Sequence, residues 1–192
     1  MKLTKQTIIF FFILIAVTTI IKIICAPQIN LSGFSSVIAV SLFAGITFRE
    51  KKLAFLVPLL ALFISDSLLQ VLYKLNLFPY AGFYNGQLYN YGLFILITLI
   101  GIWLRNYKTP GIIIAALIGP TVFFLLSNFI VWKTQGTIMG YNQDLSGLMQ
   151  SYAFGIPFYR NSLISTIIFL PAFIGLYHWI KYRKFSLQVA GK

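Results

Sequence analysis

The sequence predicts an all-α integral membrane protein with six transmembrane helices in one domain over residues 1–192 and with both termini cytoplasmic. Three observations lead to this fold class. Hydrophobic residues make up 59% of the chain and charged residues 9%, with a mean hydropathy of +0.87, whereas soluble domains carry about 25% charged residues. Long apolar runs alternate with short basic clusters, and those clusters are distributed asymmetrically between the two ends of the predicted bundle.

The net charge of +12 does not indicate nucleic-acid binding. The fifteen Lys and Arg residues stand in short groups between apolar runs, which is typical of residues that anchor helices at a membrane surface. We therefore expect the lipid bilayer, and no nucleic acid, as a partner. The single cysteine, Cys25, cannot form a disulfide within the chain.

Six apolar stretches are candidate spans when about 20 residues are allowed per crossing. They cover residues 6–26, 34–48, 53–73, 88–104, 110–132 and 161–180. The first resembles a signal peptide, but Ile24 and Ala26 form a poor cleavage site and the apolar stretch continues past Lys22, so a retained helix is favoured. The second is short, and its ends are the least defined.

The third span, "LAFLVPLLALFISDSLLQVLY", follows the basic turn "REKK" and contains a carboxylate. The fourth begins within the Gly- and Asn-rich segment "YNGQLYNYG", and the fifth follows a second basic turn, "RNYKT". The sixth begins near Asn161 and ends at the basic run "KYRK". Gly, Pro and Asn punctuate these runs because they favour turns.

Basic residues determine the expected orientation. Eleven fall on one side: Lys2, Lys5, Arg49, Lys51, Lys52, Arg105, Lys108, Lys181, Arg183, Lys184 and Lys192. Four fall on the other: Lys22, Lys74, Lys133 and Arg160. Because Lys and Arg accumulate in cytoplasmic connections, the richer side is predicted to be cytoplasmic.

The two outer connections are long and rich in aromatic residues. They read "LFPYAGFYNGQLYNYG" at residues 77–92 and "KTQGTIMGYNQDLSGLMQSYAFGIPFYRN" at residues 133–161. The rings are typical either of an aromatic belt at headgroup level or of loops that cover a ligand. Within the second connection, Asp144 is expected to cap a short surface helix.

Asp66 is the most informative residue, since it is one of only three acidic residues and lies in an apolar run. Counted from the inner end of its span, it lies about 20 Å up, in the outer half of the bilayer. A charge at that depth is costly unless it faces protein or water. Gln70 and Tyr73 follow at i+4 and i+7, on the same helical stripe.

Polar residues recur at the level of Asp66 on other spans, and such convergence is typical of a small-molecule cavity. We predict a cavity with Asp66 in its floor and the aromatic loops around Tyr84 and Tyr159 as its roof. Lys22 and Arg160 are the candidates to neutralise Asp66. Three roles remain open for this carboxylate: lining the cavity, locking helices together by pairing with Lys22 or by accepting hydrogen bonds from Ser and Asn, or coupling to protons or ions. The candidate substrate-binding residues are Asp66, Gln70, Tyr84, Asn90, Asn128, Trp132, Tyr159, Arg160, Ser162 and Ser165.

No constellation for catalysis or metal binding is visible. The chain has no HExxH motif and no cysteine cluster, and its only histidine, His178, falls near the opposite face. We therefore expect no enzymatic activity, no metal and no cofactor. There is also no nucleotide-binding loop, so any use of ATP would need another subunit.

Small residues at i, i+4 spacing form patches where helices can approach closely. Ser41 and Gly45, next to the "REKK" turn, are the pair considered for contact with a partner subunit, and packing within the bundle is the alternative.

Several runs resemble the substrate-binding S components of bacterial energy-coupling-factor transporters. The run that carries this resemblance is "PLLALFISDSLL" of the third span. The chain is also similar to an uncharacterised family of small bacterial membrane proteins, itself S-component-like, in the runs "SLFAGITF", "SDSLL", "YNYG" and "GPTVFFLLSNFIVW". The resemblance, from about residue 30 onward, implies capture of a small, vitamin-like solute at the bacterial inner membrane, with a transmembrane coupling subunit and ATPases as partners. It places Asp66 at the family's acidic position and Ser41 with Gly45 at its partner patch. The alanine pair of the family's first helix is missing here. A structural or assembly protein is the alternative function.

Overall fold

The computed structural model describes residues 5–190, with the side chains of residues 7–107 and 109–181. Its elements are helical throughout that part of the chain: α1 (Lys5–Cys25), η1 (Ile29–Leu31), α2 (Val37–Thr47), α3 (Lys51–Lys74), α4 (Gln87–Leu104), η2 (Arg105–Tyr107), α5 (Lys108–Gln135) and α6 (Leu145–Ala190). The prediction of an all-α protein is confirmed. Five of the helices are long and apolar enough to cross a membrane.

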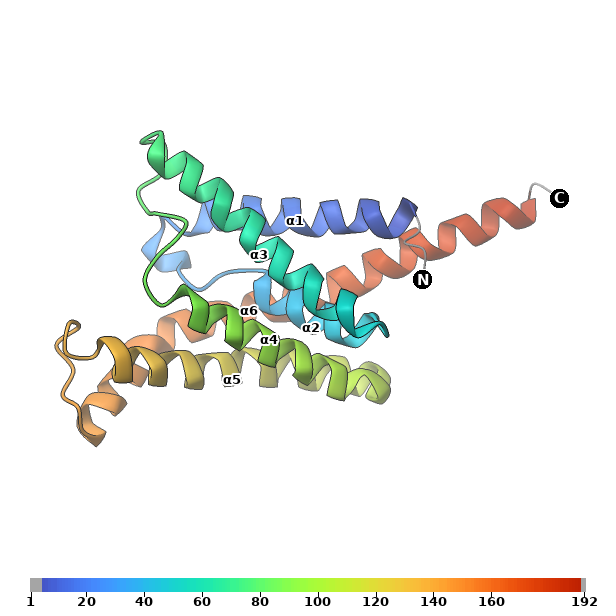
Figure 1. Ribbon diagram of the computed structural model, residues 1–192. Coiled ribbons are helices and arrows are strands. Elements are labelled where there is room, and N and C mark those ends of the chain that lie inside the picture. Colours follow the sequence, from blue (N-terminus) through green and yellow to red (C-terminus); the bar gives the residue numbers. More distant parts are fainter. Residues whose placement is uncertain (1–4, 191–192) are drawn as a thin grey trace.

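The chain runs back and forth along one direction (Figure 1). α1 begins and α6 ends at the same end of the bundle, together with the turns between α2 and α3 and between α4 and α5. We call this the basic end, and the opposite end, with the connections 75–86 and 136–144, the loop end. That the basic end is cytoplasmic stays a prediction. The side chains of Lys2, Lys5, Lys108, Arg183, Lys184 and Lys192, which entered that prediction, lie outside the described part.

The second crossing differs from the prediction. The span predicted at residues 34–48 contains only the 11-residue helix α2, which is about 16 Å long against the roughly 30 Å of a bilayer's hydrocarbon core. The irregular segment 26–36, with η1 inside it, completes the return from the loop end (Figure 1). The Ser36 hydroxyl donates to Thr18 Oγ1 of α1 at 3.1 Å, and Thr18 lies seven residues, or about 10 Å, before the end of α1. The irregular backbone therefore enters the bundle.

Polar side chains of α6 donate hydrogen bonds to this irregular backbone. Asn161 Nδ2 donates to the carbonyls of Asn30 (2.8 Å) and Ser32 (2.9 Å), Ser162 Oγ to that of Gly33 (2.9 Å), and Ser165 Oγ to that of Ser35 (2.9 Å). Non-helical backbone at membrane depth needs such partners, because lipid offers none. We call the irregular segment 26–36 together with α2 the broken second crossing. The polar residues at the start of the sixth predicted span are thus explained by their hydrogen bonds to it.

α2 forms the centre of the core, and every residue from Val37 to Gly45 is buried. Gly45 lies so close to α4 that a Cβ would overlap the backbone carbonyl of Thr98, and a Cβ on Gly101 would come within 2.6 Å of the Leu42 carbonyl oxygen. The prediction that Ser41 and Gly45 contact a partner subunit is therefore wrong, because α4 of the same chain covers the patch.

The C-terminal end of α2 is held by a side chain from beyond α4. Arg105 Nη2 donates to the carbonyls of Gly45 at 2.7 Å and Phe48 at 3.0 Å. These carbonyls have no partner inside so short a helix, and a cation also complements the negative end of its dipole. The half-length helix is thus stabilised at the basic end by Arg105.

The last helix is longer than predicted. α6 starts at Leu145, whereas the predicted span started at residue 161. Asp144 caps α6, with its Oδ1 accepting from Ser146 Oγ at 2.7 Å and from the Gly147 backbone at 2.9 Å, so the predicted capping role is confirmed. Gly155 lies where a Cβ would come within 2.5 Å of Asn128 Oδ1. The missing side chain of Gly155 permits close packing of α6 on α5. This packing outweighs the turn preference of the Gly and Pro residues in this segment.

Candidate functional site

A buried ion pair joins three helices near the loop end. Asp66 of α3 is 2% exposed and pairs through Oδ1 with Lys22 of α1, whose side chain is 24% exposed. Asp66 Oδ2 accepts from Gln87 Nε2 at 2.5 Å and from the Tyr91 hydroxyl at 3.3 Å, both of α4. The pairing alternative with Lys22 is confirmed, and both carboxylate oxygens have partners within this chain.

The other residues expected around Asp66 bond elsewhere. Gln70 Oε1 accepts from the backbone N–H of Phe83 at 3.0 Å, and Asn128 Nδ2 donates to the Phe124 carbonyl of its own helix at 2.8 Å. Ser162 and Ser165 bond to the irregular segment 26–36, as described above. The hydrogen bonds of Gln70, Asn128, Ser162 and Ser165 described above thus go to backbone groups and not to Asp66. That they form one solute site with Asp66 stays a prediction.

The connection 75–86 folds back onto α3 directly over Asp66. Gly82 is so close to α3 that a Cβ would overlap the Asp66 carbonyl and come within 2.5 Å of the Gln70 nitrogen. The Phe83 ring lies 6.1 Å from that of Phe63, centroid to centroid. Gln87 Nε2, besides its bond to Asp66, contacts the Gly82 carbonyl at 3.4 Å. The glycine is required here because two backbones meet.

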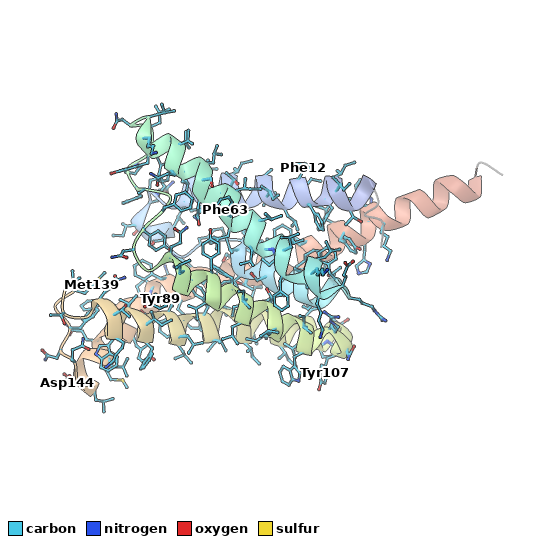
Figure 2. All side chains as sticks on the ribbon, in the orientation of Figure 1. Phe12, Phe63, Tyr89, Tyr107, Met139 and Asp144 are labelled. Atoms are coloured by element: carbon cyan, nitrogen blue, oxygen red, sulfur yellow. The ribbon has the colours of Figure 1, made fainter. Side chains whose placement is uncertain are left out.

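A pocket of about 620 Å³, which we call the aromatic pocket, lies between α3, the connection 75–86 and the start of α4. Its walls carry five rings and two amides: Phe63, Phe83, Tyr84, Tyr89, Tyr91, Asn85 and Gln87. In Figure 2, Phe63 lies on α3 and Tyr89 at the loop end of α4. Gln87 and Tyr91 belong both to the pocket wall and to the Asp66 cluster, so the ion pair fixes the back of the pocket.

A second, smaller cavity of about 150 Å³ lies between α4 and α5 and shares Tyr84 and Tyr89 with the aromatic pocket. Asn90, Ser127 and Gln135 supply its polar lining, and Asn90 Nδ2 donates to the Tyr84 hydroxyl. Burial raises the pKa of Tyr84 above its ordinary value, so this phenol is neutral at physiological pH. Of the predicted site residues, Tyr84 and Asn90 line these spaces.

Three predicted residues, Trp132, Tyr159 and Arg160, are not among the residues that line either space. Trp132 Nε1 donates to the Asn142 carbonyl at 2.9 Å. The Tyr159 hydroxyl lies 2.9 Å from Thr121 Oγ1, and its ring stacks on Phe124 with 4.8 Å between centroids. Arg160 is exposed on α6. The prediction that Tyr159 roofs the cavity beside Tyr84 is wrong, because residues 145–161 are helix rather than loop.

Sequence reasoning missed Gln87 and Tyr91 as partners of Asp66. Both were assigned to the outer loop or its rim, where polar and aromatic residues need no special explanation. Their i, i+4 spacing places them on one face of a helix that begins at Gln87. A helix start one residue earlier than predicted would have indicated this pair.

The described residues contain no group of three or more His, Cys, Asp or Glu side chains that could hold a metal ion. The arrangement instead offers a mostly apolar, aromatic pocket with placed amides and hydroxyls, which is the usual composition of a site for an organic molecule.

Five spanning helices, a short buried helix and an intramembrane ion pair define a multi-pass helical membrane protein. The particular family follows from the sequence: the model of a family of unknown function, DUF6580, matches residues 2–188, and the chain belongs to that family. No curated protein and no solved structure matches it.

Proposed function

We propose that the protein is the solute-binding subunit of a transport system in the bacterial inner membrane, and that it captures a small organic solute in the aromatic pocket from the outer side. The observation that carries the proposal is the shared wall: Gln87 and Tyr91 line the pocket and hydrogen-bond to the buried Asp66. The function follows the resemblance to S components and needs no catalytic activity of its own.

The cost of the ion pair supports a functional reading. Buried ion pairs contribute weakly to stability, because desolvation offsets much of their attraction. Ionisable groups at membrane depth are therefore uncommon and mark functional sites by default. Here the pair lies directly behind a pocket, where it holds two lining side chains in fixed positions.

The broken second crossing also favours transport. Transporters commonly use discontinuous helices, with irregular backbone tolerated where other helices satisfy it. In this chain Asn161, Ser162 and Ser165 satisfy segment 26–36.

Energy for transport would come from a transmembrane coupling subunit and ATPases, as the resemblance implies. Because Ser41 and Gly45 are covered by α4, such a partner would contact another face of the bundle.

The proposal is tested by purifying the protein in native-lipid nanodiscs and identifying bound small molecules by mass spectrometry. Tyr89→Leu should abolish co-purification of the solute. Tyr107→Leu is the matched control, since Tyr107 is 54% exposed against 52% for Tyr89 and lies at the basic end of the α4 region (Figure 2). Equal solute content in the two variants would contradict the assignment of the pocket.

A structural or assembly protein is the second candidate. The observation in its favour is that Asp66, Ser162 and Ser165 all bond within the chain, as residues that only lock helices would. In that case no solute co-purifies, and substitutions at these positions change stability alone.

A further inference from the structure

We propose that the aromatic pocket selects an organic cation. This inference rests on the proposed function and adds the charge of the solute. Five rings from three parts of the chain line the pocket: Phe63 of α3, Phe83 and Tyr84 of the connection 75–86, and Tyr89 and Tyr91 of α4. Ring faces carry negative potential and attract cations within about 6 Å of their centroids.

The orientation of the ion pair adds to this potential. Lys22 binds Asp66 Oδ1, whereas Oδ2 receives Gln87 and Tyr91, which line the pocket. The pair is therefore a dipole whose negative end lies on the pocket side. Lys22 itself is absent from the pocket lining, and none of the described lining residues is charged.

Two polar groups of the wall, Gln87 and Tyr91, have their donors committed to groups of this chain. Gln87 Nε2 donates to Asp66 and to the Gly82 carbonyl, and Tyr91 donates its only proton to Asp66. What these side chains can still offer a solute is an amide oxygen and a phenolic lone pair, which are acceptors. Acceptors and ring faces suit a cation, whereas an anion would meet neither a positive charge nor a free donor from this part of the wall.

The test uses three probes of the same shape and number of non-hydrogen atoms: 1-methylnicotinamide, a cation; 3-methylbenzamide, its neutral isostere; and 3-methylbenzoate, an anion. Their dissociation constants are measured by ligand-observed NMR on the protein in nanodiscs. The expected result is at least tenfold tighter binding of the cation than of the neutral probe, equivalent to about 1.4 kcal/mol, and no detectable binding of the anion.

Two substitutions should move the cation-to-neutral ratio in opposite directions. Lys22→Met leaves the carboxylate uncompensated and should raise the ratio, whereas Asp66→Asn leaves Lys22 uncompensated and should lower it. The ratio is insensitive to partial loss of folding, since both probes report on the same folded fraction. Tyr89→Leu should also lower the ratio, and Tyr107→Leu should leave it unchanged. A residue that only locked helices would not alter the ratio.

Equal binding of the cation and its neutral isostere, stronger binding of the anion, or no binding of any probe would overturn the cation assignment. The proposed function is judged separately by the co-purified solute. If the co-purified solute is neutral or anionic and is lost in Tyr89→Leu, the proposed solute-binding function stands and the selectivity for a cation is refuted. Absence of any co-purified solute would refute the proposed function itself.

Discussion

The cluster around Asp66 predicts an unequal cost for removing its two charges. Lys22→Met strands a carboxylate that is 2% exposed, and stranding a buried charge costs about 3–5 kcal/mol. Asp66→Asn strands an ammonium whose side chain is 24% exposed and lies three residues before the end of α1. Because a lysine there can extend its stem toward the interface, we expect a loss of only about 1–3 kcal/mol.

The double variant separates pairing from packing. With both charges removed, the Met side chain faces an uncharged amide that keeps partners in Gln87 and Tyr91. Lys22→Met/Asp66→Asn should therefore be more stable than Lys22→Met alone, which requires a coupling energy larger than the cost of Asp66→Asn, about 1–3 kcal/mol. Free energies of unfolding are measured by denaturant titration in mixed micelles. A double variant whose loss equals the sum of the single losses, or a larger loss for Asp66→Asn than for Lys22→Met, would refute the ion-pair reasoning.

The remaining predictions concern the loop, the broken crossing, the cap of α6 and the topology. Gly82→Ala should lift connection 75–86 from α3 and make it more sensitive to limited proteolysis, whereas Gly92→Ala, with nothing within 4 Å of its added Cβ, should not; equal sensitivity would contradict the close contact. Asn161→Ala should lower the free energy of unfolding by about 1–3 kcal/mol for each carbonyl left unpaired, and Ser127→Ala, which loses only a 3.3 Å bond to its own helix, is the control that should cost far less. Hydrogen bonds from Gly147 and Ser146 lower the pKa of Asp144 below its ordinary value of 3.8, so the cap's stabilisation is complete above that value and is lost as the pH falls through the lowered pKa; hydrogen exchange of the first turn of α6 should follow this loss in the wild type and be independent of pH in Asp144→Asn. Reporter fusions at Arg49 and Lys108 should report the cytoplasm and those at Asn85 and Asp144 the outer side, and an outer signal at Lys108 would refute the orientation.

The apolar pattern alone located most of the helices. Spans predicted at 53–73 and 88–104 match α3 (Lys51–Lys74) and α4 (Gln87–Leu104) within two residues at each end. This works because the bilayer requires a backbone with internal hydrogen bonds and apolar side chains, and both requirements are local. The anomaly of Asp66 and its possible pairing with Lys22 were visible for the same reason, since a lone carboxylate at that depth needs a partner.

Only the tertiary structure decided which polar groups meet. Their sequence positions place Ser162 and Ser165 in the same predicted polar layer as Asp66, but they bond to segment 26–36 and not to Asp66. Depth along a helix follows from counting residues, whereas the direction of a side chain depends on how each helix is rotated against its neighbours. That rotation is set by packing between distant parts of the chain.

The lengths of α2 and α6 were decided in the same way. The composition of residues 34–48 suits a spanning helix, and that of residues 145–160 suits a loop, yet the first is half a span and the second is helix. Close packing of Gly155 on α5, and side chains of α6 that satisfy the irregular carbonyls, outweigh these local preferences. The sequence by itself determined a membrane protein with an anomalous buried carboxylate, and contacts between residues more than a hundred positions apart determined where its backbone could depart from helix.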